Sequence, residues 1–259
     1  MTKVQILTDI PDTGNVLGGW YLLASEEHVW CRWRFEVFLR IIKDLGISRE
    51  KELKGLDIGC GNGLIRRQLE KTTKWVVDGT DLDRQVLEEF NPERGVTMLY
   101  DIHQRNSELQ EAYDFIILFD VLEHIEDTSY FLDSVLFHLK PGGQLFINVP
   151  AREEFRTRYD DAVGHVKRYS KRSLKEEFNE KPVTFLGVQY WGFLMIPLLL
   201  IRKAMLASSN LSHDQIVDRG FSNRSKVVDS VVSALKYLEQ KIFHRSPFGS
   251  SVMASIQKK

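Results

Sequence analysis

Short apolar runs alternate with amphipathic segments through the middle of the chain. Each run has the length of a strand that is buried on both faces, and the segments between them repeat apolar residues at helical spacing. From Leu53 to Val149, this alternation predicts a parallel sheet with right-handed crossover helices. The main expected elements are strands at Leu53–Ile58, Trp75–Val77, Val96–Tyr100, Phe115–Phe119 and Gln144–Val149, and helices at Leu64–Glu70 and Thr128–Leu139.

The regions on either side follow other patterns. Residues 1–19 contain proline and glycine and are expected to be irregular. From Ser25 to Leu45, apolar residues recur at steps of three and four, which predicts a helix that Gly46 ends. After the fifth strand we expect a long polar loop, a helix and a strand, at Ala151–Arg168, Ser173–Phe178 and Val183–Tyr190.

The C-terminal third contains two strongly apolar segments before a last expected strand at Ser251–Gln257. Phe193–Ile201 is intensely apolar and is interrupted by Pro197. A second segment predicts an amphipathic helix, whose apolar face would hold Val227, Val228, Val231, Leu235, Leu238 and Ile242. Residues 191–248 therefore form an insertion much larger than a hairpin loop.

A glycine-rich turn follows the first expected strand, with the sequence Asp57-Ile58-Gly59-Cys60-Gly61-Asn62-Gly63. Glycines at these positions let the backbone approach a ligand closely and adopt positive φ angles. The next three strands end on acids, at Asp81, Asp101 and Asp120. Because the carboxyl ends of parallel strands meet at one sheet edge, these acids are expected beside one ligand, with Asp81 placed to accept hydrogen bonds from ribose hydroxyls. The third glycine of a dinucleotide motif is absent, since that position is Leu64.

These motifs together resemble the class I S-adenosylmethionine (SAM) methyltransferases over roughly residues 50–190. The resemblance rests on Leu56–Gly63, Asp81-Leu82-Asp83, Asp101-Ile102, Phe119-Asp120-Val121-Leu122-Glu123-His124 and Leu139-Lys140-Pro141-Gly142-Gly143. It implies an α/β, Rossmann-like sheet of seven strands in the order 3-2-1-4-5-7-6, whose last two strands form an antiparallel pair. The chain would divide into an N-terminal helical lid (residues 1–48), a SAM-binding core (49–190), the helical insertion (191–248) and the last core strand (249–259).

The resemblance also implies which residues hold SAM. Asp57, Gly59, Cys60, Gly61 and Gly63 would form the turn around its methionine portion. Asp81 would bind the ribose and Asp101 the adenine amine, while Leu82 and Ile102 would flank the adenine ring, and Asp120 and Val121 would lie near the sulfonium. Taken singly, each acid could equally be a solvated strand end or a helix cap. Asp83 is better explained as the N-cap of a helix over Arg84–Phe90.

The candidate catalytic residues are His165, Tyr169 and His124. The first two lie in Gly164-His165-Val166-Lys167-Arg168-Tyr169, which resembles a G-H-x-x-R-Y segment of bacterial small-molecule and glycan methyltransferases. His124 could accept a substrate proton, although a structural hydrogen bond is the competing interpretation. Arg168 belongs to a basic stretch, Ala151–Lys175, which could bind an anionic acceptor or be a solvated surface.

Aromatic residues near the N-terminus offer a lid over the site. Glu26-Glu27-His28-Val29-Trp30 resembles the start of a lid helix in the same group, so His28 and Trp30 are candidate substrate-binding residues, with Trp20 and Trp33 nearby. Helical spacing equally favours the tryptophans as core residues. Residues 191–203 have the pattern of a membrane-interfacial anchor, for which a buried helix or a homodimer contact is the alternative.

Composition limits the function further. The net charge of −1 and the absence of an N-P-P-[YF] motif argue against nucleic acid as a partner. Two cysteines, no recognisable signal peptide and scattered histidines predict a cytoplasmic protein without a metal site. A peripheral position at the inner membrane face is the alternative that residues 191–203 leave open. The expected function is SAM-dependent methyl transfer to an oxygen or nitrogen of a small-molecule, glycan or lipid-linked acceptor. The alternative is a non-catalytic SAM-fold subunit.

Overall fold

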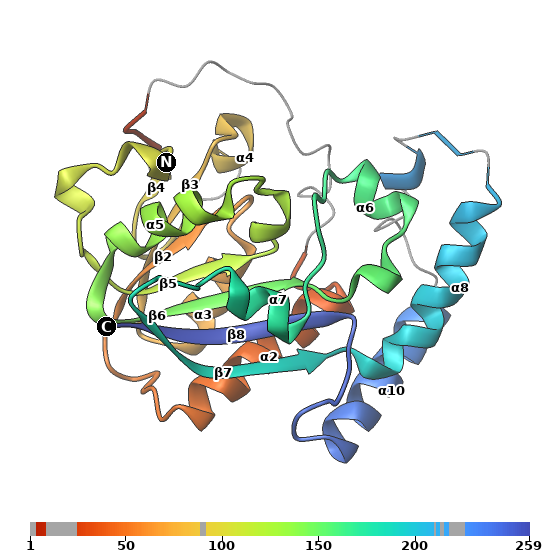
Figure 1. Ribbon diagram of the computed structural model, residues 1–259. Coiled ribbons are helices and arrows are strands. Elements are labelled where there is room, and N and C mark those ends of the chain that lie inside the picture. The colour runs from red at the N-terminus through yellow and green to blue at the C-terminus, as the bar shows by residue number, and fades with distance from the viewer. Residues whose placement is uncertain (1–3, 9–24, 89–91, 210, 213–214, 218–225) are drawn as a thin grey trace.

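The computed structural model describes residues 4–8, 25–88, 92–209, 211–212, 215–217 and 226–259, and it contains one eight-stranded sheet. The strand order is β1-β4-β3-β2-β5-β6-β8-β7 (Figure 1). The strands are β1 (Gln5–Ile6), β2 (Lys54–Ile58), β3 (Val76–Asp81), β4 (Thr97–Leu99), β5 (Tyr113–Phe119), β6 (Leu139–Pro150), β7 (Val183–Trp191) and β8 (Ser251–Lys258).

The predicted topology is confirmed, with one strand added. Without β1, the order is the predicted 3-2-1-4-5-7-6, and β8 is antiparallel to both of its neighbours. The additional strand, β1, pairs in parallel with β4 and lies within residues 1–19, which were expected to be irregular. It is short and exposed, so no apolar periodicity marks it in the sequence. Residues 1–3 and 9–24, including Trp20, lie outside the described residues.

Helices cover both faces of the sheet. The main ones are α2 (Val29–Asp44), α3 (Leu64–Thr72), α4 (Arg84–Glu88), α5 (Thr128–His138), α6 (Arg158–Ala162), α7 (Lys171–Glu176), α8 (Ile196–Ala207) and α10 (Lys226–Ile242). Side chains of β5 alternate between two cores, because successive strand residues point to opposite faces. Phe115, Ile117 and Phe119 pack with α2 and α3, whereas Ile116 and Leu118 pack with α5 and α7.

Two predicted boundaries need correction. The fifth core strand, β6, begins at Leu139 and not at Gln144, because Leu139 pairs with Tyr113 before the ladder shifts and resumes at Gln144. The polar loop Ala151–Arg168 contains a 3-10 turn (Glu153–Phe155) and the helix α6. Thr157 and Asp160 form a capping box at the start of α6, which satisfies its first backbone amides.

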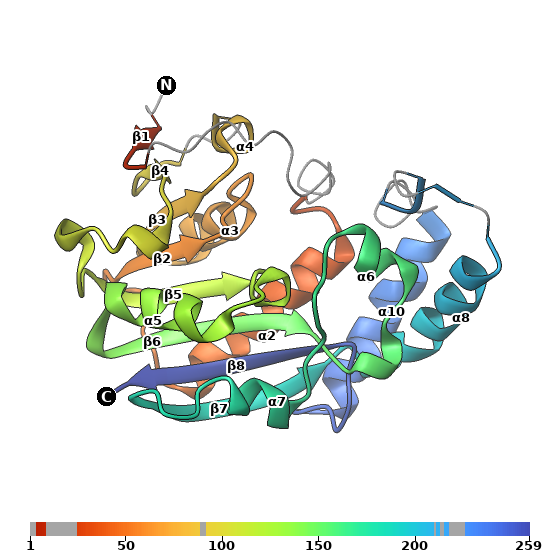
Figure 2. The ribbon, with the colours of Figure 1, turned by 45° about the horizontal axis from the view of Figure 1, so that its top comes forward.

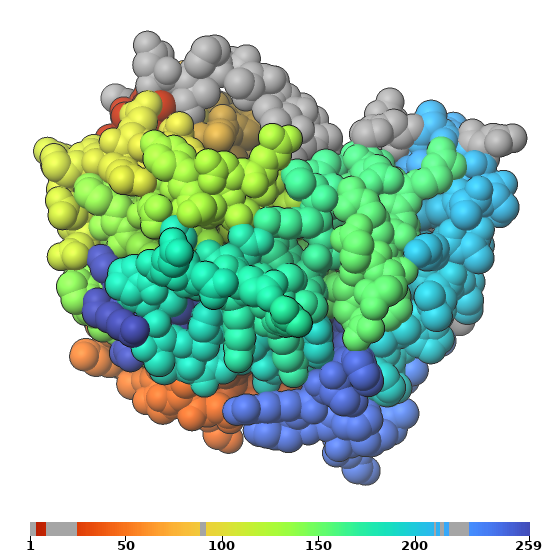
Figure 3. Space-filling view, in the orientation of Figure 1, coloured from red at the N-terminus to blue at the C-terminus, as the bar shows by residue number. Residues whose placement is uncertain are grey.

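The insertion forms helices α8 and α10, which stand beyond the end of the sheet where the parallel strands finish (Figure 2). Pro197 does not interrupt a helix: it lies in the first turn of α8, where a missing amide hydrogen costs nothing. Together with the green segment that contains α6, α8 forms the lobe at one end of the molecule (Figure 3).

Helix α8 exposes large apolar side chains on this lobe. Leu200, Ile201 and Met205 of α8 are 48%, 56% and 67% exposed. Four residues of the predicted apolar face of α10 are exposed as well, namely Val228, Val231, Leu238 and Ile242. Leu235 of the same face packs against the core, and the side chain of Val227 lies outside what the structure describes. Val232 and Glu239 of this helix are buried. The amphipathic pattern of α10 therefore marks an outward surface more than a core contact.

Candidate active site

The glycine turn between β2 and α3 has a backbone that only glycine adopts easily. Gly59, Gly61 and Gly63 have φ angles of 69°, 50° and 74°. The amides of Gly59 and Cys60 donate to the Thr80 carbonyl oxygen at 2.8 and 3.0 Å, which joins the turn to the end of β3. A Cβ atom at Gly59 would lie 2.6 Å from Cγ2 of Val121. The turn therefore packs directly against the segment that follows β5.

Asp81 is the acid most closely tied to this turn. Its Oδ2 accepts from the Gly61 amide at 2.9 Å, and its Oδ1 accepts from the amides of Leu82 and Asp83 at 2.7 and 3.1 Å. Burial raises the pKa of Asp81 and also raises that of Asp57 to about 7, against the opposing charges of Arg66 and Arg34. A carboxylate has about four acceptor sites. Oδ1 of Asp81 already accepts from two amides and Oδ2 from one, so Oδ2 keeps capacity for a ribose hydroxyl.

The residues predicted to bind adenine differ in burial and in hydrogen bonding. Asp101 caps a 3-10 turn, since its Oδ1 accepts from the His103 amide at 2.9 Å. Ile102 is buried, whereas Leu82 is 49% exposed. The N-cap prediction for Asp83 is confirmed by hydrogen bonds from the amides of Gln85 and Val86 at 2.9 and 3.2 Å, and residues 89–91 at the expected helix end lie outside the described residues.

Asp120 is held by a polar network that the sequence did not predict. Arg34 of α2 forms an ion pair with Asp120 Oδ2, and Asn148 Nδ2 of β6 donates to Oδ1 at 2.6 Å. Trp191 Nε1 in turn donates to Asn148 Oδ1 at 2.9 Å. Asp120 itself adopts a left-handed φ of 59°, an unusual conformation that this network stabilises. The partners come from α2, β6 and β7, so only the tertiary structure brings them together.

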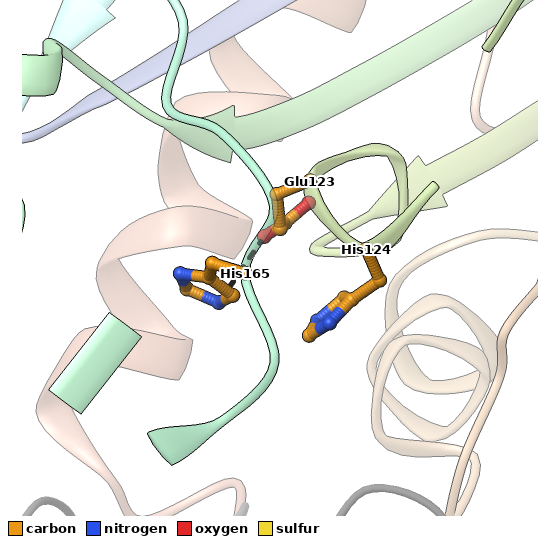
Figure 4. Close-up of side chains that lie close together, drawn as sticks. All are labelled: Glu123, His124 and His165. Carbon is orange, nitrogen blue, oxygen red and sulfur yellow. Dashed lines mark ion pairs between the residues drawn. The ribbon is translucent and has the colours of Figure 1, made fainter. Parts of the chain in front are cut away.

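Glu123, His124 and His165 form a cluster (Figure 4). All three line the same cavity as Asp120. One donor atom from each residue lies within 4.8 Å of the others. His165 Nδ1 contacts Asp160 Oδ1 at 2.9 Å, and its Nε2 lies 3.9 Å from Glu123 Oε1. His124 Nδ1 lies 3.1 Å from the Gly164 carbonyl oxygen.

Burial sets the charges of this cluster. It raises the pKa of Glu123 well above its usual value, and the nearby Asp120 charge adds to the effect. Burial and the neighbouring His165 lower the pKa of His124 to about 4. For Asp160, burial would raise the pKa, but the hydrogen bond with His165 and the charge of Arg168 outweigh it and hold the pKa below its usual range. His124 is therefore neutral at pH 7, and Asp160 is ionised.

The cluster forms one wall of a cavity of about 160 Å³. Three of the predicted substrate or catalytic side chains line it beside His165, namely Trp30, His124 and Arg168. Glu123 and Asp160 were not predicted as site residues, although Glu123 belongs to the motif Phe119–His124. The cavity is also lined by Asp120, Pro150, Phe155, Thr157, Tyr159, Val163, Met195, Leu199, Arg202, Ser250 and Ser251.

Tyr169 and Arg168 have different surroundings from those expected. Tyr169 is 1% exposed, and its hydroxyl donates to the Leu122 carbonyl oxygen at 3.2 Å, so it does not line the cavity. Arg168 lines the cavity, but its Nε donates to Asp160 Oδ1 at 2.9 Å and its Nη1 to the Ala151 carbonyl oxygen at 3.0 Å. Arg168 therefore holds Asp160, and through it His165, where we had expected it to bind an anionic acceptor.

The aromatic residues of α2 divide between the core and the site. Trp33 is 1% exposed and belongs to the core. Trp30 lines the cavity and packs against Trp191, with their ring centroids 4.3 Å apart. His28 precedes α2 at its N-cap position, and its Nδ1 lies 4.0 Å from Cys31 Sγ. The structure thus brings Trp30, but not His28, to the cavity.

Comparison with known proteins gives the family. The family model described as "Methyltransferase domain" matches residues 30–181, which is more than half of the chain. The chain belongs to this family. The resemblance predicted from the sequence is confirmed at this level, and the G-H-x-x-R-Y detail stays a prediction.

Curated relatives of this methyltransferase-domain chain match it over a shorter region. The ubiquinone biosynthesis O-methyltransferase of Rickettsia felis is 31% identical over 101 residues, which are 38% of this chain and 41% of the relative. The human mitochondrial ubiquinone biosynthesis O-methyltransferase is 30% identical over 103 residues, 37% of this chain and 28% of the relative. The chain thus spans less than half the length of these relatives.

Solved structures support the fold. Phosphoethanolamine N-methyltransferase 2 of Haemonchus contortus has a TM-score of 0.54 at 17% identity, over 86% of this chain and 52% of that chain. The [4+2]-cyclase SpnF has a TM-score of 0.53 at 16% identity, over 85% and 81%. At these identities the likeness concerns the fold alone, and the two proteins show that the fold carries different reactions.

Proposed function

We propose that the chain is a SAM-dependent methyltransferase acting on an oxygen of a small-molecule, glycan or lipid-linked acceptor. The observation that carries the proposal is the packing of Gly59 against Val121. Val121 belongs to the same segment as Asp120, Glu123 and His124, which line the cavity, so this contact joins the glycine turn to the cavity wall. A cofactor held by the turn would have its reactive end beside the cavity that holds the acceptor. The O-methyltransferase names of the relatives favour oxygen over nitrogen.

The methyl group would move in one displacement step. The acceptor oxygen attacks the methyl carbon, the C–S bond breaks with its electrons going to sulfur, and S-adenosylhomocysteine leaves. We assign the hydroxyl proton to His165 Nε2, because Asp160 occupies Nδ1 and so directs Nε2 toward Glu123 and the cluster. The enzyme's other task is to align the oxygen with the methyl group and to exclude water.

The cavity lining favours an acceptor with an apolar or flat body and a polar reacting end. Trp30, Phe155, Met195 and Leu199 supply apolar surface, while the histidine cluster supplies the polar wall. Helix α8 contributes Leu199 and Arg202 to the cavity and exposes Leu200, Ile201 and Met205 elsewhere on its surface. A lipid-linked acceptor could therefore pass from a membrane surface along α8 into the cavity. None of the described helices is long and apolar enough to cross a membrane.

This route predicts weak, reversible binding to anionic vesicles that decreases with added salt. Co-sedimentation with phosphatidylglycerol vesicles measures it. Replacing Ile201 and Met205 together with serine should remove the binding, because both side chains are more than half exposed. Leu186→Ser, at an exposed residue of β7, is the matched control and should leave binding unchanged. If the wild type stays in the supernatant at low salt while light scattering gives a dimer mass, the apolar surface is a homodimer contact.

Calorimetric titration with SAM and with S-adenosylhomocysteine tests the cofactor assignment. The proposal predicts binding of one equivalent of either compound. The alternative of a non-catalytic SAM-fold subunit predicts weak binding or none. Absence of heat for both compounds, with a folded protein, would therefore favour the alternative.

A further inference from the structure

The cluster of Glu123, His124 and His165 has the chemistry of a metal site that the methyl transfer proposed above does not require. The three residues supply one carboxylate and two imidazoles, with one donor atom from each within 4.8 Å of the others. The set comes from two separate segments, the turn after β5 and the loop after α6 (Figure 4). The sequence predicted no metal site, because its histidines are scattered and it has no C-x-x-C motif.

Hydrogen bonds orient both histidines as metal ligands are usually oriented. A carbonyl oxygen can only accept, so His124 Nδ1 carries the hydrogen that it donates to the Gly164 carbonyl oxygen at 3.1 Å. His165 Nδ1 likewise donates to Asp160 Oδ1 at 2.9 Å. In both neutral rings the lone pair is therefore on Nε2. A carboxylate or a carbonyl behind each histidine is the arrangement that fixes the tautomer of a metal-binding imidazole.

Glu123 provides an independent observation. The side chain is 1% exposed, and its Oε2 atom has no hydrogen-bond partner among the residues that the structure describes. A buried carboxyl oxygen without a partner is costly, and a cation would remove that cost. Because Glu123, His124 and His165 all line the cavity, an ion would reach them from solvent through the space that the acceptor uses.

We propose that Glu123, His124 and His165 bind a divalent transition-metal ion of the Zn²⁺, Co²⁺ or Fe²⁺ kind. Two imidazoles with one carboxylate suit these ions and disfavour Mg²⁺ and Ca²⁺, which take oxygen ligands. Bonds of about 2.1 Å place neighbouring donors about 3.0–3.4 Å apart. Because the donor atoms now lie within 4.8 Å of one another, the cluster must contract by up to about 1.8 Å on binding. Side-chain rotation into the cavity supplies this movement.

Ion binding does not depend on the proposed methyl transfer, but its consequence for the reaction does. Three protein ligands leave coordination positions open toward the cavity, as in catalytic sites. A bound cation would favour the deprotonated form of the acceptor hydroxyl. His165 would then act as a ligand, and the proton would pass to solvent.

Titration of the tag-free, chelator-treated protein with Co²⁺ and with Zn²⁺ tests the proposal. We expect calorimetry to show binding of one equivalent of each ion. Bound Co²⁺ should also give visible ligand-field absorption, and millimolar Mg²⁺ should not displace it. Glu123→Gln and His124→Gln should each weaken binding by about 10–100-fold or more. His244→Gln is the matched control, because His244 also faces a carboxylate, Asp44 at 3.3 Å, and should bind the ion as the wild type does.

Two controls make the result decisive. The melting temperature and circular dichroism of Glu123→Gln establish that the variant is folded, and its SAM titration is measured separately. A wild-type protein that binds SAM but no stoichiometric ion would overturn the metal site and leave the methyltransferase proposal intact. Equal Co²⁺ affinity in the wild type, Glu123→Gln and His124→Gln would also overturn it.

Discussion

Replacing Gly61 with valine should reduce SAM affinity more than any other single change at the turn. Gly61 has a φ of 50°, and its amide donates to Asp81 Oδ2 at 2.9 Å. A β-branched side chain is strained at this φ and would fill space that the cofactor needs. Asp81→Ala should weaken binding by about 1.5–3 kcal/mol, because ribose hydroxyls and the turn amide lose their acceptor. Calorimetry with SAM measures both effects.

Gly46→Val is the matched control for this prediction. Gly46 has a similar φ of 68°, lies at the end of α2, and has open space where a Cβ atom would be. Both valine variants should lower the melting temperature through backbone strain, but only Gly61→Val should lose SAM affinity. Wild-type SAM affinity in Gly61→Val would mean that the turn is purely structural.

His165→Ala should reduce turnover by about 10²–10⁴-fold while SAM affinity stays close to that of the wild type. His165 lines the acceptor cavity and is positioned by Asp160, whereas the glycines of the cofactor turn, Gly59, Gly61 and Gly63, do not line that cavity. Single-turnover rates and SAM titration measure the two quantities separately. The loss is expected whether His165 accepts the proton or binds an ion.

Two companion variants test the positioning network behind His165. Asp160→Asn and Arg168→Ala should lower kcat more than they raise KM for the acceptor, because both residues orient His165 and neither is assigned to binding. His103→Ala, at a histidine that stacks on Tyr130 outside the cavity, should keep wild-type turnover. A His165→Ala enzyme with full turnover on its acceptor would exclude the assignment and direct attention to His124.

The sequence predicted the sheet well because its signals are local. The apolar runs that became β2, β3, β5 and β8 are bounded by turn residues, and their alternation with helices leaves few topologies. β1 carried no such signal, because two exposed residues are ordered only by pairing with β4. The apolar face of α10 was recognised, but helical periodicity alone does not tell whether such a face meets the core or the solvent.

The site was predictable only in part, for a similar reason. The positions of residues at strand ends were predictable because the topology places strand ends together: Asp81 contacts the glycine turn, and Asp120 lines the cavity. Side-chain partnerships between distant segments were not found, as with Arg34 and Asn148 around Asp120 or Asp160 behind His165. For Tyr169 the sequence indicated a role that the structure does not favour. Its place in a motif indicated catalysis, but its hydroxyl donates a hydrogen bond to the Leu122 carbonyl oxygen.

Transfer of a labelled methyl group tests the central claim most directly. Metabolite and lipid extracts incubated with the protein and trideuteromethyl-SAM should contain a product that carries the label, detected by mass spectrometry, together with S-adenosylhomocysteine. The label should be absent with Gly61→Val and strongly reduced with His165→Ala. If the folded, SAM-saturated wild type yields neither labelled product nor S-adenosylhomocysteine above the no-protein background from any extract, the chain is not the methyltransferase proposed here.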